Sequence, residues 1–355
     1  MTPLPTREPA RVPGLPHTTR RPGHLPARLA AMIPAAALAL LATTGLAPTA
    51  TAAPGGLAWV SSEKDNALTL IDLQSLAVVG TVPTCARPRH LQKRGDGRQL
   101  LVACSDAGRA DQIDLASRRS VGRLHLGPDP ELFDLSPDGR TAWVSAEDDS
   151  ALERIDLVTQ KVTGQVAVGP EPEGVKLSPD GRRVYVASEV ANLVHVIDTA
   201  TLKILTNIPV PARPRRFAFG AEGRELWVSS ELGSAVSVID TATHTVQASL
   251  KFEVPGLRAE DITPVGLAMA PDGRTLYVAL GRANRVAFVD VASRRVRAQV
   301  LVGKRAWGLG LSRDGARLWV VNGLSDDVTV VDTAKAQPIR SIPVGRVPHS
   351  VVIDD

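Results

Sequence analysis

Seven aspartates recur at a near-constant spacing, and each closes an apolar run that reads as a β-strand. The intervals are 42 residues five times and 50 residues once. A fixed period of this length, with four short strands in each unit, is typical of repeat folds whose units bury their faces only against their neighbours. The sequence therefore predicts an all-β chain, a seven-bladed β-propeller of four-stranded antiparallel blades. The aspartates are Asp72, Asp114, Asp156, Asp198, Asp240, Asp290 and Asp332.

A second periodic marker indicates how the ring closes. Acidic residue–glycine pairs, typical of tight hairpin turns, occur in six units, and the first unit lacks one. That unit opens directly on a strand at Leu57, whereas the last unit ends with a surplus strand at residues 350–354. We therefore expect the C-terminal strand to complete the first blade. The pairs lie at residues 96–97, 138–139, 180–181, 222–223, 272–273 and 314–315.

Residues 1–52 differ in kind from the rest and predict an export signal peptide with a disordered leader. Arginines precede an apolar stretch at residues 29–46, and Ala-Thr-Ala follows at 50–52. This order is typical of a cleavable signal, with cleavage near Ala52/Ala53 and a single propeller domain over residues 53–355. The apolar stretch is too short for a stable membrane anchor. Thr-Arg-Arg at 19–21 leaves twin-arginine and general export both open.

The charge of the chain lies in the leader. Five arginines and one glutamate there account for the whole net charge of +4, so the predicted mature ring is near neutral. A neutral ring without a helix to enter a groove argues against a nucleic-acid partner.

Cys85 and Cys104 are the two cysteines, and both fall in the second unit. Either a disulfide in an oxidising compartment or two small buried thiols fits their positions. No Cys-x-x-Cys-His motif is present, which excludes covalently attached haem. The histidines show no metal-ligand spacing, so no metal centre is predicted.

Several segments carry a resemblance to the YVTN β-propeller repeat family. They are Tyr-Val-Ala-Ser at 185–188, Trp-Val-Ser-Ser at 227–230, Trp-Val-Val-Asn at 319–322, and Ser-Pro-Asp-Gly at 136–139 and 178–181. Further segments resemble the subgroup called PQQ-dependent catabolism-associated β-propeller proteins. These lie at residues 127–133, 171–174, 252–256 and 279–286.

The resemblance spans residues 57–353 and implies a periplasmic propeller from bacteria that oxidise alcohols with pyrroloquinoline quinone (PQQ) enzymes. It places PQQ on the associated dehydrogenase and predicts no cofactor on this chain. Its implied partners are a quinoprotein dehydrogenase or another periplasmic protein. The second unit departs from the pattern at residues 92–95, and its short run at 112–114 puts the regularity of that blade in doubt.

Candidate binding residues lie at positions that recur in every unit but carry different side chains from one unit to the next. In a propeller, the connection into each inner strand lines one mouth of the central channel. The acids of two adjacent units are flanked by arginines there, and loops with Glu63, Glu147, Glu189 and Glu231 should lie on the same face. The candidate ligand- or partner-binding residues are Arg87, Arg89, Asp129, Glu131, Glu171, Glu173, Arg213, Arg215, Arg305, Trp307 and His349.

Two interpretations of these residues remain open. In the first, they form solvated ion pairs between blades, each worth about 0–1 kcal/mol. In the second, they form a polar pocket whose arginines hold a small anionic ligand or an acidic loop, with Trp307 as an apolar platform. The repeated aspartates are interpreted as turn caps.

Two function classes follow. The first is a non-enzymatic periplasmic binding propeller, with no catalytic residues. The alternative is a lactonase-like hydrolase or lyase, for which His349, Glu131 and Glu173 are the candidates.

Overall fold

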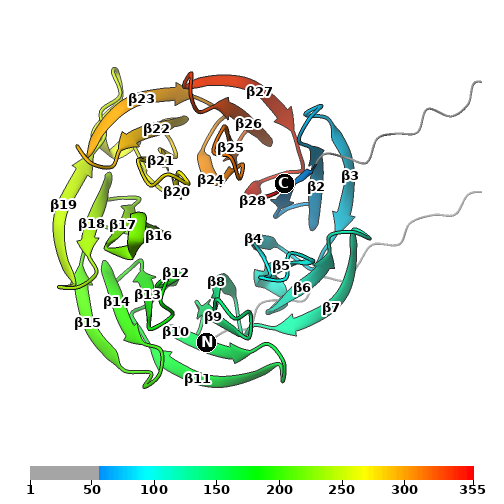
Figure 1. Cartoon of the computed structure of the whole chain (residues 1–355), viewed down its shortest axis with the longest axis vertical. Coiled ribbons are helices and arrows are strands. Elements are labelled where there is room, and N and C mark those ends of the chain that lie inside the picture. Colours follow the sequence, from blue (N-terminus) through cyan, green and yellow to red (C-terminus); the bar gives the residue numbers. More distant parts are fainter. Residues whose placement is uncertain (1–55) are drawn as a thin grey trace, which may run out of the picture. The chain divides into compact units, whose positions relative to one another are not determined.

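Seven four-stranded antiparallel sheets form a ring in the computed structural model, which describes residues 56–355 (Figure 1). The predicted signal peptide and leader lie outside these residues. Blade 1 holds β28 (Pro348–Asp354), β1 (Leu57–Ser62), β2 (Ala67–Asp72) and β3 (Val78–Pro83). Blade 2 holds β4 (Pro88–Lys93), β5 (Gln99–Cys104), β6 (Arg109–Asp114) and β7 (Arg119–His125). Blade 3 holds β8 (Pro130–Leu135), β9 (Thr141–Ala146), β10 (Ala151–Asp156) and β11 (Lys161–Ala167).

The remaining blades follow the same order from the inner to the outer strand. Blade 4 holds β12 (Pro172–Leu177), β13 (Arg183–Ser188), β14 (Leu193–Asp198) and β15 (Ile204–Pro209). Blade 5 holds β16 (Pro214–Phe219), β17 (Glu225–Ser230), β18 (Ala235–Asp240) and β19 (Thr245–Lys251). Blade 6 holds β20 (Leu267–Met269), β21 (Thr275–Ala279), β22 (Arg285–Asp290) and β23 (Arg295–Leu301). Blade 7 holds β24 (Ala306–Leu311), β25 (Arg317–Asn322), β26 (Asp327–Asp332) and β27 (Gln337–Pro343).

The predicted ring closure is confirmed. Strand β28 pairs antiparallel with β1, and the register joins Leu57 to Asp354 and Trp59 to Val352. The C-terminal strand thus supplies the inner strand that the first unit lacks, and no unpaired strand edge remains at the seam.

Apolar side chains from adjacent blades fill the spaces between the sheets. Trp59, Trp227 and Trp319 stand at the same position of the second strand in their blades, and all three are fully buried. One cluster packs Trp59 and Leu68 of blade 1 against residues of blade 2 such as Leu100. Because each face is buried only against a neighbour, the ring behaves as one cooperative array.

Among the described residues, helix is limited to the short 3₁₀ turns η1 (Ser105–Ala107), η2 (Ala221–Gly223) and η3 (Ala259–Asp261), as predicted. None of the helical segments within residues 56–355 has the length and apolarity to span a membrane. The doubt about blade 2 was wrong, since its four strands pair as regularly as those of its neighbours.

The repeated aspartates are turn caps. Each accepts a backbone N–H from the residue three positions later; Asp72, for example, accepts from Ser75 at 2.7 Å, and Asp332 from Lys335 at 2.9 Å. For Asp72, these hydrogen bonds hold the carboxyl pKa below its usual value. The turn-cap interpretation is therefore confirmed, and these aspartates play a structural part in every blade.

Candidate binding site at the channel mouth

The candidate residues form two layers at the start of the inner strands. The deeper layer is buried in every blade, with at most 8% of each residue exposed, and the outer layer lies two residues earlier in each blade. The deeper layer consists of Arg89, Glu131, Glu173, Arg215, Val265, Trp307 and His349. The outer layer consists of Arg87, Asp129, Glu171, Arg213, Thr263, Arg305 and Val347.

Backbone geometry fixes the outer layer. Its residues have left-handed φ angles between 39° and 61° in every blade but the sixth. In four blades an Asn or Asp from the preceding blade accepts the backbone N–H of the outer-layer residue; Asn284, for example, accepts from Arg305 at 2.8 Å. Side-chain amides and carboxylates commonly hold such turns, so in these four blades the preceding hairpin positions the mouth residue.

Serines of the second strand fix the deeper layer. Ser61 donates to the carbonyl of Arg89 at 2.7 Å, Ser145 to that of Glu173 at 2.8 Å, and Ser229 to that of Val265 at 2.6 Å. Each bond joins one blade to the inner strand of the next. The serine of the Trp-Val-Ser segments therefore holds neighbouring inner strands together around the channel.

A buried ion-pair network centres on Arg215. Its guanidinium contacts Glu173 at 2.9 Å and Glu231 at 2.8 Å, and it also pairs with Glu189. The Arg215 side chain is only 7% exposed. The interpretation as solvated loop pairs is therefore wrong for this residue, because water does not screen a pair at this depth.

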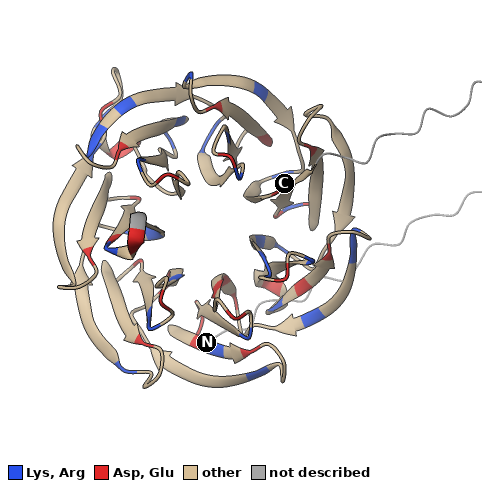
Figure 2. Ribbon diagram, viewed as in Figure 1, with Lys and Arg blue, Asp and Glu red and all other residues tan. Residues whose placement is uncertain are grey.

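Arg89 and Arg87 form the second part of the network. The buried Arg89 pairs with Glu131 of the next blade and lies 3.8 Å from Glu63. The more exposed Arg87 lies between three carboxylates at 3.4–3.7 Å, those of Glu63, Asp106 and Asp129. Both arginines are thus neutralised from within the chain. Segments of both charge signs are spread around the ring (Figure 2).

The network shifts two carboxyl pKa values in opposite directions. Burial would raise the pKa of Glu173, but Arg216, Arg215 and Arg89 outweigh it and hold that pKa well below its usual value. Burial, together with the nearby charge of Glu173, raises the pKa of Glu189 to about 7. Glu173 is therefore the permanent anion of the network, and Glu189 titrates near neutral pH.

Arg216 belongs to this network, although the repeat pattern did not predict it. Its guanidinium contacts Glu173 at 2.5 Å. A register shift in the pairing of β16 with β17, between Pro214 and Phe217, interrupts the two-residue alternation of the strand. Consecutive residues, Arg215 and Arg216, can therefore reach the same carboxylate. The two-residue alternation expected of a strand does not predict that consecutive residues contact one carboxylate.

Three carboxylates gather at blade 3. Oxygens of Asp129, Glu131 and Glu147 all lie within 4.8 Å of one another. Burial and the charges of Glu173 and Asp129 raise the pKa of Glu147. The like charges of neighbouring carboxylates therefore act on Glu147, although arginines pair with Glu131 and Asp129.

Trp307 does not offer the expected apolar platform. It is 4% exposed, with the Arg305 guanidinium 4.0 Å from its ring centroid and that of Arg215 at 5.2 Å. His349 lies beside it, with ring centroids 6.2 Å apart, and burial lowers the His349 pKa so that the imidazole is neutral. A ligand at this position would meet the cation above Trp307 rather than its ring.

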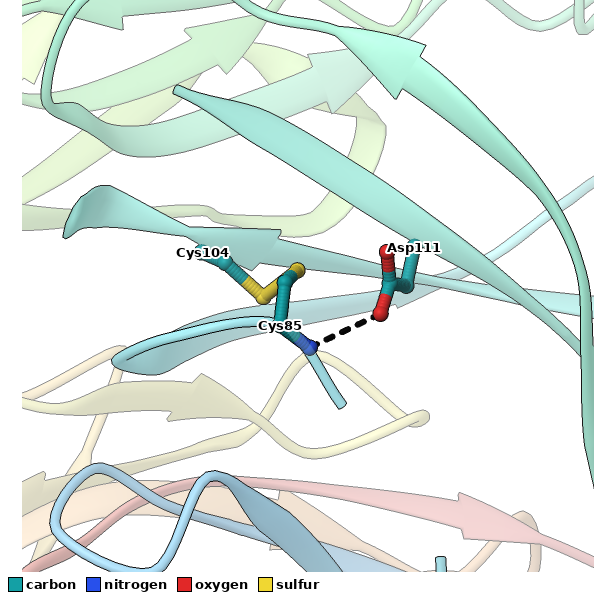
Figure 3. A group of neighbouring side chains, drawn as sticks. All are labelled: Cys85, Cys104 and Asp111. Atoms are coloured by element: carbon teal, nitrogen blue, oxygen red, sulfur yellow. Dashed lines mark hydrogen bonds between the residues drawn. A yellow bond between two sulfur atoms is a disulfide. The ribbon is translucent and has the colours of Figure 1, made fainter. Parts of the chain in front are cut away.

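Cys85 and Cys104 are joined by a disulfide in blade 2 (Figure 3). Asp111 of the next strand accepts the backbone N–H of Cys85 at 2.8 Å. In blade 4 the matching positions hold Gly169 and Ser188, where the serine hydroxyl donates to the glycine carbonyl at 3.0 Å. The disulfide replaces this hydrogen bond and fixes the loop that leads to Arg87.

Below the mouth the inner strands enclose a channel cavity of about 260 Å³. Every blade contributes lining residues, including His90, Phe133, Lys176 and Arg216. Burial lowers the pKa of His90 to about 3, so this histidine is neutral. The cavity is large enough only for water or a small molecule.

The fold and this mouth define a seven-bladed β-propeller with a charged channel mouth. The sequence matches the model of the family "Lactonase, 7-bladed beta-propeller" over residues 204–338, and that of "Cytochrome D1 heme domain" over residues 133–216. Each match covers less than half of the chain. No curated protein matches the sequence.

Solved structures share the fold. Hydrazine synthase of Kuenenia stuttgartiensis matches with a TM-score of 0.71 and 23% identity, over 79% of this chain and 93% of that one. A functionally unknown protein from Desulfotomaculum acetoxidans DSM 771 matches with a TM-score of 0.71 and 14% identity, over 84% and 98%. The dihydro-heme d1 dehydrogenase NirN in complex with DHE matches with a TM-score of 0.65 and 17% identity, over 88% and 78%.

The histidine of the segment that matches the heme-domain model is not placed to bind iron. His195 is the one histidine within residues 133–216. One ring nitrogen contacts Asn207 at 2.7 Å, and the other contacts Ser188 at 2.9 Å and accepts from the Gly169 N–H at 3.0 Å. Both nitrogens are thus engaged inside blade 4, and the side chain is buried.

Proposed function

We propose that this protein is a non-enzymatic binding propeller of the periplasm that serves PQQ-dependent alcohol oxidation. PQQ belongs to the partner dehydrogenase in this proposal. The resemblance of residues 57–353 to the PQQ-associated propellers and the signal-like order of residues 1–52 support it. The bound species is a quinoprotein dehydrogenase, another periplasmic protein or a small anion, and it contacts the channel mouth.

The rigidity of the charged mouth carries this proposal. Arg89 and Arg215 are held by buried carboxylates, and hydrogen bonds from the preceding blade fix the backbone of the outer layer. A rigid surface with partly exposed arginines recognises a partner at low entropic cost. Among the described residues, the side chain of His349 contacts the hydroxyl of Ser350 and makes no hydrogen bond to a carboxylate, so this pair lacks the acidic group that orients the base in a catalytic triad.

A pull-down tests the proposal. The tagged protein, expressed in alcohol-grown cells and recovered from the periplasm, is analysed by mass spectrometry for proteins and small molecules. We expect a quinoprotein dehydrogenase or one defined metabolite to be recovered, and an Arg87→Gln, Arg213→Gln variant to recover less of it. Equal recovery from both proteins would place the contacts outside the channel mouth.

A lactonase-like hydrolase is the second candidate. The match of residues 204–338 to the lactonase model favours it, and the carboxylates of Asp129, Glu131 and Glu147 lie close enough to hold a cation that polarises a carbonyl. The neutral imidazole of His349 would serve as base. Glu173 would not, because its carboxylate pairs with Arg215 and Arg216.

Lactone hydrolysis distinguishes this second candidate from the first. A panel of lactones is assayed with Ca²⁺, with Mg²⁺ and with a chelator, for the wild type and for Glu131→Gln. Metal-dependent turnover that Glu131→Gln abolishes would establish the hydrolase. Rates equal to those of buffer under all conditions would eliminate it.

A further inference from the structure

Arg305 differs from the other arginines of the mouth. Arg87, Arg89, Arg213, Arg215 and Arg216 each have a carboxylate oxygen within 4.0 Å. Within residues 56–355 the guanidinium of Arg305 makes no ion pair and no hydrogen bond, and it lies over the Trp307 ring, 4.0 Å from the ring centroid. Glu231, the carboxylate whose charge acts on it most, is already held by Arg213 and Arg215.

We propose that Arg305 is the anion-accepting group of the channel mouth and that it binds a carboxylate. Trp307 covers one face of the guanidinium, and the edge that carries the N–H groups remains for a ligand. A carboxylate matches that edge through two parallel hydrogen bonds, which a lysine ammonium cannot reproduce. This inference rests on the proposed function and assigns a ligand class to the same mouth.

The position of Arg305 is fixed before any ligand arrives. Its backbone N–H donates to Asn284 at 2.8 Å, and its carbonyl accepts from Gly323 at 3.0 Å. The preceding Lys304 is bound in the same way, with its N–H on Ser325 and its carbonyl on Leu324. A held backbone and a stacked side chain reduce the entropy lost on binding.

The surroundings of Arg305 favour an anion with a short apolar body. Burial lowers the Arg305 pKa, and the charge of Arg215 lowers it too, so an anion would relieve both effects. The exposed Lys304 adds positive potential beside it. Leu324, which donates its N–H to Lys304, is 65% exposed and offers an apolar contact. A short aliphatic carboxylate therefore satisfies the charge and the apolar neighbour together.

Calorimetric titration tests the inference, with butyrate as the probe and butyramide as its neutral counterpart, at constant ionic strength. We expect the wild type to bind butyrate and not butyramide. Arg305→Gln should abolish butyrate binding, and Arg305→Lys should weaken it by about tenfold or more, because the two-bond contact is lost. Arg274→Gln, on the hairpin turn between β20 and β21, is the matched control and should bind like the wild type.

The outcomes separate this inference from the proposed function. Equal butyrate affinity in wild type and Arg305→Gln, or equal binding of butyramide, overturns the role of Arg305. If no free carboxylate binds but capture of the quinoprotein depends on Arg305, the carboxylate is an acidic side chain of the partner. If neither butyrate binding nor capture of the quinoprotein depends on Arg305, the inference fails. Capture that depends only on Arg87 and Arg213 would still support the proposed function.

Discussion

The two sides of the channel mouth use arginine differently. On blades 2 to 5, Arg89 and Arg215 are less than 10% exposed, and each is surrounded by carboxylates of its own chain. On blade 7, Arg305 is half-buried, stacked on Trp307 and without a carboxylate partner among the described residues. A deeply buried charge requires a partner in the fold, whereas a half-buried one can await a ligand. Arg89 and Arg215 therefore stabilise the ring, whereas Arg305 can bind a ligand.

Removing residues 348–355 should have the largest effect, because it deletes β28 between the two sides of the mouth. The edge of β1 and the apolar faces beside it would be exposed. We expect the melting temperature to fall by at least about 10 °C, or the cooperative transition to be lost, since several kcal/mol of stability are removed. Calorimetry measures this, and an unchanged melting temperature would contradict the closure.

Replacing Arg215 by Met should be the next largest change. It leaves Glu173, Glu189 and Glu231 close together and buried, with fewer counter-charges, which costs about 3–5 kcal/mol. Arg305→Met is the matched variant on the other side of the mouth and should cost less than about 1 kcal/mol, the loss of one cation–π contact. Urea unfolding compares the two. Similar losses would remove the distinction between the two sides.

Breaking the disulfide tests how blade 2 holds Arg87. The variant Cys85→Ser, Cys104→Ser should lose about 2–4 kcal/mol. The variant Cys85→Gly, Cys104→Ser installs the pair that blade 4 uses at Gly169 and Ser188, and it should recover part of that loss. If the second variant is no more stable than the first, the hydrogen-bonded pair cannot replace the covalent link in blade 2.

The pH dependence of stability reports on Glu189, on the side of the mouth where carboxylates surround the arginines. The Glu189 pKa of about 7 in the fold exceeds its unfolded value of about 4.3. The folded chain therefore holds an extra proton between these values, and the free energy of unfolding should fall as pH rises from about 4.5 to about 7.

Glu189→Gln should flatten that slope. Glu173 has the opposite shift, so its contribution should be lost as pH falls below about 4.5. Unfolding curves across pH 4–8 give both slopes. An identical slope for the wild type and Glu189→Gln between pH 5 and pH 7 would contradict the assignment of the neutral titration to Glu189.

The repeat made the fold predictable, and side-chain packing limited what the sequence could say about the mouth. The period and the missing first hairpin indicated seven blades and the closing strand. The sequence register also gave the two layers of mouth residues. It could not give the pairing of Arg215 with three carboxylates, because pairing depends on how side chains reach between blades.

Arg216 escaped prediction because a register shift interrupts strand alternation. Trp307 was wrongly expected to offer an apolar platform, since a periodic pattern does not show that a cation covers the ring. The disulfide was one of two alternatives that composition left open. The fold shows why these positions can be joined, because in blade 4 the β-carbon of Ser188 lies only 2.9 Å from where a β-carbon on Gly169 would be.

The pairing of β28 with β1 bears on how fast the chain can fold. Blade 1 is the one blade assembled from residues almost 300 positions apart, so its formation requires the most distant encounter in the molecule. Asp354 and Leu57 are paired neighbours in the ring. A circular permutant that joins Asp355 to Gly56 and opens the chain between two other blades would turn this encounter into a seventh local hairpin. The permuted protein should refold faster and keep the same mouth.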